Sequence, residues 1–203
     1  MQILLRPLRR TPDLSPWVVR ETWETTRARD LRRVRENVYE ATVGRESPGT
    51  PLPDGLHRYL AIVVMSYQAF PDSLVTPNLV RSPVEVGDTV GTQYHLAPGV
   101  DLFFASRVIE AFDEQRDSHW RTGFTYSTLV GHPVMGSETF SVEKNLATGE
   151  ISVALRSWSH PITRLARCFA IPCRILQAQA GRAALAKLQH LAAECEAERN
   201  AKM

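Results

Sequence analysis

The chain has 203 residues, 43% of them hydrophobic, and a formal net charge of +2. This length fits one domain with apolar residues enough for a single core, and the near-neutral charge gives no argument for nucleic-acid binding. The apolar runs are too short for a signal peptide or a membrane span, so we expect a cytoplasmic protein with no transmembrane segment. Three cysteines, an odd number, argue against a disulfide framework and favour reduced thiols.

Positive charge is concentrated at the start of the chain. Residues 1–35 hold nine Arg against four Asp or Glu, a local charge of +5 that leaves about −3 for the rest. We predict a basic N-terminal arm over 1–35, helical from about residue 17 to 34, followed by one domain over 36–203. Such an arm could bind an acidic partner or an anionic surface. The alternative is a solvated helix face with intrahelical ion pairs.

The first half of the domain reads as a strand and a helix. β-branched and aromatic residues alternate over 37–43, which predicts a strand, and the Gly- and Pro-rich stretch 44–55 predicts a loop. Apolar residues then recur at helical spacing from 56 to 67, before Pro71 ends the helix. Pro77 and Pro83 break the stretch that follows.

The second half reads as β structure followed by a long helix. Alternation predicts strands over 90–96 and 102–112, the latter with Val108, Glu110 and Phe112 on one face. Two further strands, 120–128 and 138–142, are joined by a loop that carries His132, and a strand over 151–157 closes the sheet. Apolar residues at helical spacing predict a C-terminal helix that starts at His160-Pro161 and is interrupted at Pro172.

This order of elements predicts an α+β fold: an antiparallel sheet wrapped around a long C-terminal helix, the helix-grip arrangement. Thr92, Tyr94, Tyr126, Thr128 and Glu138 share faces with apolar residues of the sheet. A mixture of aromatic and polar groups is typical of a ligand pocket between sheet and helix. The same pattern is equally typical of a sheet whose polar face meets solvent.

Three stretches resemble a known family. They are Arg107-Val-Ile-Glu-Ala-Phe-Asp-Glu, Gly123-Phe-Thr-Tyr-Ser-Thr-Leu-Val-Gly-His-Pro and Glu138-Thr-Phe-Ser-Val-Glu, with Trp158-Ser-His-Pro and Gln177 further on. They resemble the bacterial and plant family DUF1990, or UPF0548, over roughly residues 60–192. The resemblance implies a fold similar to the START, SRPBCC or Bet v 1-like helix-grip proteins. Ser127 and Ser137 depart from the family pattern, and no activity is implied because the family is uncharacterised.

His132 and Glu138 are the candidate catalytic residues. His132 lies between Gly131 and Pro133 on a constrained loop, and histidine exchanges protons near neutral pH. Glu138 starts the returning strand, so it could form an acid/base pair with His132 beside Tyr126. The alternatives are a loop histidine bonded to the backbone and an exposed glutamate paired with an arginine.

We predict seven ligand-binding residues and three possible functions. The predicted residues are Tyr94, Phe124, Tyr126, Thr128, His132, Phe140 and Trp158. The leading hypothesis is binding of a hydrophobic small molecule or lipid in the cavity. The alternatives are a cyclase- or dehydratase-type enzyme that uses His132 and Glu138, and an interaction module that acts through the basic arm. A cavity of several hundred Å³ would favour the first two. No cofactor is implied, and the histidines and cysteines lack the spacing of a metal site.

Overall fold

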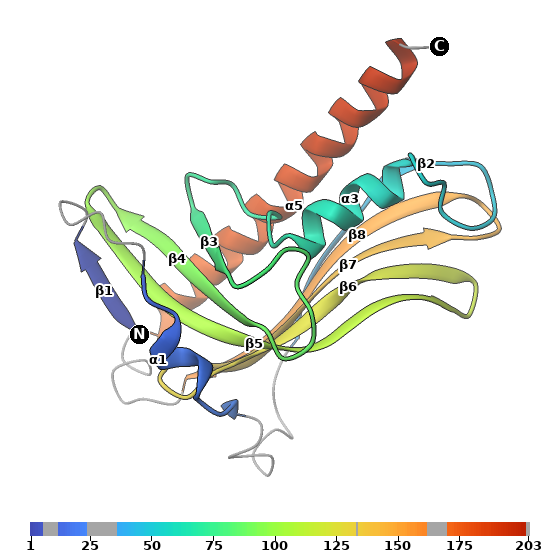
Figure 1. Cartoon of the computed structure of the whole chain (residues 1–203). Coiled ribbons are helices and arrows are strands. Elements are labelled where there is room, and N and C mark those ends of the chain that lie inside the picture. Colours follow the sequence, from blue (N-terminus) through green and yellow to red (C-terminus); the bar gives the residue numbers. More distant parts are fainter. Residues whose placement is uncertain (6–11, 24–35, 133, 162–169, 202–203) are drawn as a thin grey trace.

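The computed structural model describes residues 1–5, 12–23, 36–132, 134–161 and 170–201 (Figure 1). Three helices are described, α1 (Ser15–Val18), α3 (Leu56–Met65) and α5 (Ala170–Ala201). The strands are β1 (Gln2–Leu5), β2 (Asn37–Arg45), β3 (Val75–Leu79), β4 (Thr89–Ala97), β5 (Val100–Arg116), β6 (His119–Thr128), β7 (Val134–Asn145) and β8 (Glu150–Pro161).

The described strands form one curved antiparallel sheet. Seven of them follow the order β2-β8-β7-β6-β5-β4-β3, and β1 pairs with the start of β5. β4 to β8 are consecutive in the chain and adjacent in space, as the alternating sequence predicts. β3 was not predicted because Pro77 lies in it. β3 is an edge strand of the sheet. Edge strands tolerate proline, because one side of the strand has no neighbour to accept a hydrogen bond.

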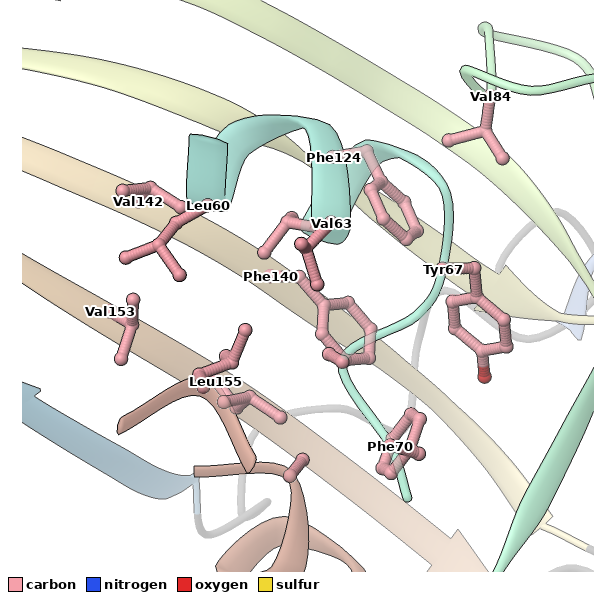
Figure 2. Packing of buried hydrophobic residues seen from close by; sticks show 14 of the residues in the cluster. Leu60, Val63, Tyr67, Phe70, Val84, Phe124, Phe140, Val142, Val153 and Leu155 are labelled. Atoms are coloured by element: carbon pink, nitrogen blue, oxygen red, sulfur yellow. The ribbon is translucent and has the colours of Figure 1, made fainter. Parts of the chain in front are cut away.

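The two longer helices lie on the same side of the sheet (Figure 1). The main core lies between them and the sheet. It contains Leu60 and Val64 of α3, Leu188 of α5, and Phe124 and Phe140 of the sheet. Figure 2 shows these sheet residues beneath α3. The curled sheet gripping a C-terminal helix confirms the predicted helix-grip fold.

The N-terminal segment packs against the other face of the sheet. Trp17 is 1% exposed and meets Phe103 edge to face, with ring centroids 6.2 Å apart. Arg20 lies over the Trp17 ring and donates to the Val130 carbonyl, and Arg107 donates to the Val18 carbonyl. Residues in contact with the sheet cannot be deleted without exposing it. Neutralising arginines, rather than removing 1–35, is therefore the sound test of the predicted arm.

A bulge in β5 changes which side chains face the core. The register shifts between Val108 and Glu110, so both Val108 and Ala111 pack into the main core. The expectation that Val108 and Phe112 share a face is therefore wrong. Phe112 instead lies under the guanidinium of Arg121 at 4.9 Å.

The helical end of the chain begins later than the sequence indicates. His160 and Pro161 pair with Met135 and Val134 as the last residues of β8, so the predicted helix start at 160 is wrong. α5 is described from Ala170. Pro172 lies within the described helix and does not interrupt it, so the predicted break is wrong.

Candidate functional site

A cavity of about 180 Å³ lies between the sheet and α5. Its wall comes from β2 to β8, from the segment after α3, and from Leu176, Gln177, Ala180 and Gly181 of α5. Drug-sized ligands occupy pockets of roughly 300–1,000 Å³, whereas a cavity of about 150 Å³ is enough to bind benzene. The cavity is therefore smaller than the several hundred Å³ expected, and its size suits a molecule with about one ring.

Five of the seven predicted ligand-binding residues line this cavity. They are Tyr94, Tyr126, Thr128, His132 and Trp158. The sheet brings them together from β4, β6, the β6–β7 turn and β8. Their contact with a ligand stays a prediction.

Phe124 and Phe140 do not line the cavity, so the structure gives no support to their predicted contact with a ligand. Both are buried, at 0% and 1% exposed, and their rings stack with centroids 5.2 Å apart (Figure 2). They share the inner face with Tyr126, as the alternation predicts. However, α3 covers the part of the sheet that holds Phe124 and Phe140. The cavity begins only beyond the end of α3, where Tyr67 and Phe70 line it.

Glu138 and Tyr126 form the polar centre of the cavity. They are cross-strand neighbours on β7 and β6, and the Tyr126 hydroxyl donates to Glu138 Oε2 at 2.5 Å. The ring of Tyr67 lies 6.0 Å from that of Tyr126, and its hydroxyl is 3.1 Å from the Thr92 hydroxyl. This site places one carboxyl group among aromatic rings.

Burial shifts the pKa values of both Glu138 and Tyr126. It raises the pKa of Glu138 to about 7, and the Tyr126 hydrogen bond opposes it only in part. Burial, together with the nearby Glu138 charge, raises the pKa of Tyr126 well above its usual value. Tyr126 therefore remains a hydrogen-bond donor at neutral pH, while Glu138 exchanges its proton there.

Tyr67 lines the cavity. The predicted helix over 56–67 included this residue wrongly. α3 ends at Met65, and Tyr67 takes a left-handed φ of 53°. Such a backbone is costly for a bulky residue unless the surroundings hold it. Here the Thr92 hydrogen bond and the rings of Phe70 and Phe140 do so. No periodicity in the sequence could reveal this turn.

His132 is buried and neutral. It is 8% exposed, its Nδ1 lies 2.9 Å from the Val134 carbonyl, and its ring meets Phe104 edge to face. Burial lowers the pKa of His132 to about 3, against a smaller opposing effect of the Val134 backbone. This is the backbone-bonded loop histidine that the sequence left open as an alternative. The left-handed φ of 99° at Gly131 lets the chain make this turn.

The structure does not join His132 and Glu138. Both line the cavity, but Glu138 bonds to Tyr126 and His132 to Val134. Among the described residues, no hydrogen bond links the two side chains. Their acid/base roles stay a prediction, and Tyr126 is the direct partner of Glu138.

Glu138 and His132 make opposite contributions to the pH dependence of stability. The folded-state pKa of Glu138, about 7, exceeds its ordinary 4.5, so its contribution is full below pH 4.5 and lost as pH rises through 7. The folded-state pKa of His132, about 3, lies below its ordinary 6.5, so its contribution is full above pH 6.5 and lost as pH falls.

We therefore expect Glu138→Gln to lose stability more steeply than the wild type as the pH falls from 6.5 to 4.5. The slopes of the unfolding free energy against pH should differ by about 1.4 kcal/mol per pH unit. In the wild type, the proton on folded Glu138 offsets the effect of His132, and the variant lacks that proton. Denaturant unfolding at several pH values measures this. Equal slopes would contradict the raised pKa of Glu138.

The Ser159 hydroxyl donates to Gln177 Oε1 at 3.1 Å, which links β8 to α5 through two residues of the family-like stretches.

Of the nine N-terminal arginines, Arg20 alone lies among the described residues, and the acidic partner stays a prediction.

The described residues contain no group of three His, Cys, Asp or Glu side chains that could hold a metal ion. Within the same residues, no helix has the length and apolar character needed to cross a membrane.

Solved structures with a similar fold are distant in sequence. The KanY protein (ms6282) has 10% identity and a TM-score of 0.52, over 79% of this chain and 98% of that one. The hypothetical protein jhp0584 from Helicobacter pylori has 10% identity and a TM-score of 0.52, over 79% and 88%. Ara h 8.0201 has 10% identity and a TM-score of 0.46, over 80% and 99%. The first two support the fold alone.

The sheet, its gripping helix and the cavity between them define a helix-grip protein. No curated protein matches the sequence. The family model described as domain of unknown function (DUF1990) matches residues 22–187, and the chain belongs to this family.

Proposed function

We propose that this protein binds a small hydrophobic molecule in the cavity between the sheet and α5. The observation that carries the proposal is a space of about 180 Å³ with aromatic walls around one polar centre, Tyr126 and Glu138. Apolar burial would supply affinity at about 25 cal/mol per Å². The hydroxyl and carboxyl groups would orient the polar end of the ligand.

Filling the cavity tests this proposal. Ala180 of α5 lines the cavity, whereas the neighbouring Gln179 is exposed on the same helix. We expect Ala180→Trp to abolish binding of a one-ring probe such as indole, because the added ring occupies the ligand's volume. Gln179→Trp should bind like the wild type.

Calorimetry and ligand-detected NMR measure the binding, and far-UV circular dichroism checks that both variants fold. Native mass spectrometry of the purified wild type would further show whether a small molecule is carried along. Equal probe binding by both variants would refute a ligand site here.

Proton-transfer catalysis is a second candidate, and the Tyr126–Glu138 contact favours it. A carboxyl group with a pKa of about 7 can both accept and return a proton at neutral pH. Neutral His132, on the same wall, would then orient the substrate by hydrogen bonding. A cyclase or dehydratase reaction would lose its rate in Glu138→Gln while substrate binding remained. Loss of binding alone would favour the binding role.

A further inference from the structure

Glu138, a half-buried residue on the cavity wall, differs from the buried acids Glu46, Asp88 and Asp101 in what compensates its charge. Glu46 pairs with Lys144 at 2.8 Å, and Asp88 pairs with Arg81 at 3.2 Å. Asp101 bonds to the His95 ring at 2.9 Å and accepts from the Gln93 amide at 2.7 Å. Glu138 has no cationic partner among the described residues, and its single hydrogen bond comes from a neutral hydroxyl, on Oε2. A half-buried carboxylate without a counter-ion, on an aromatic cavity wall, attracts a cation that a ligand supplies.

The second carboxyl oxygen is available to a ligand. Oε1 of Glu138 has no hydrogen-bond partner among the described residues, and Glu138 lines the cavity. The fully buried unpartnered side-chain atoms of the described residues do not include it. Within the described part of the chain, Oε1 is therefore not fully enclosed by packed atoms.

The cavity wall suits a cationic ligand with a ring. Tyr67, Tyr94, Tyr126, Phe104 and Trp158 all contribute to it. The faces of aromatic rings attract ammonium groups, and a desolvated site strengthens that attraction. The volume of about 180 Å³ limits the apolar part to about one ring.

From this geometry we propose that the cavity selects small aromatic amines, whose ammonium group pairs with Glu138. This inference rests on the proposed function and names its ligand class. The ammonium would donate to Oε1, while Tyr126 keeps its bond to Oε2. The ring would lie among the aromatic side chains of the wall.

The proposal predicts a pH dependence of a particular sign. Glu138 must lose its proton to pair with an ammonium, so protons compete with the amine below the pKa of about 7. Benzylamine stays protonated over this range. Its affinity should rise about tenfold between about pH 6 and about pH 8, and binding at about pH 6 should release close to one proton. Benzyl alcohol, of the same shape but uncharged, should bind equally at both pH values.

Calorimetry in two buffers of different ionisation enthalpy measures both affinity and proton release. Glu138→Gln should lower benzylamine affinity at about pH 8 by roughly tenfold or more, remove the proton release, and leave benzyl alcohol unchanged. The matched control is Glu143→Gln on the same strand, whose carboxylate pairs with Arg121 at 3.2 Å. It should behave like the wild type in every assay.

The possible outcomes separate the amine inference from the proposed function. Equal binding of benzylamine and benzyl alcohol at about pH 8 would overturn the amine inference and leave the proposed function standing. Tighter binding of benzaldehyde or benzoate than of benzylamine would overturn it too, since a protonated Glu138 would then act as donor. Failure of every ring compound to bind the wild type better than Ala180→Trp would overturn the proposed function itself.

Discussion

Replacing Lys144 with methionine should destabilise the fold by about 3–5 kcal/mol, because it leaves a buried carboxylate without its counter-ion. The side chains of Lys144 and Glu46 are both 0% exposed and 2.8 Å apart. Burial alone would raise the pKa of Glu46. Hydrogen bonds from Lys144 and from the backbone N–H groups of His57 and Leu52 outweigh it and hold that pKa below its ordinary value.

Denaturant unfolding near neutral pH measures this loss. The control is Arg156→Met, since Arg156 and Glu40 are 3.5 Å apart on the surface and about half exposed. It should change stability by less than about 1 kcal/mol. The penalty of Lys144→Met should shrink in acid, as Glu46 takes up a proton and its charge disappears. A penalty no larger than that of Arg156→Met would count against a buried pair.

Truncating Phe140 to alanine should cost about 3–5 kcal/mol by leaving a cavity in the main core. Phe140 is 1% exposed and contacts the rings of Phe124, Tyr67 and Phe70. Phe112, half-buried under Arg121, is the matched control. Phe112→Ala should cost clearly less, because its surroundings reach solvent.

Urea or guanidinium unfolding of the two variants gives the comparison. A second readout separates core packing from ligand contact. The conservative variant Phe140→Leu should retain indole binding per folded molecule, since Phe140 does not line the cavity. Loss of binding in a fully folded Phe140→Leu would restore the original assignment of this residue as a ligand contact.

Side-chain alternation was enough to place the sheet and its main faces. Tyr126 and Glu138, found from their period, do lie side by side on the inner face, and the apolar stripe of α5 does pack on the sheet. The conformation of His132 was foreseen only as an alternative to a catalytic role. Its bond to Val134 depends on a turn that a two-residue period cannot describe.

The sequence by itself determined the strand periodicity, the helix stripes and hence the helix-grip arrangement, because hydrophobic burial acts locally on every element. Tertiary structure alone decided where on the inner face the core ends and the cavity begins. The decision depends on how far α3 reaches along the sheet, so Phe140 is covered and Glu138 is not. It also depends on the bulge in β5 and the turn at Tyr67, which local patterns do not encode. Removal from water, a property of the assembled fold, is what raises the pKa of Glu138 to about 7.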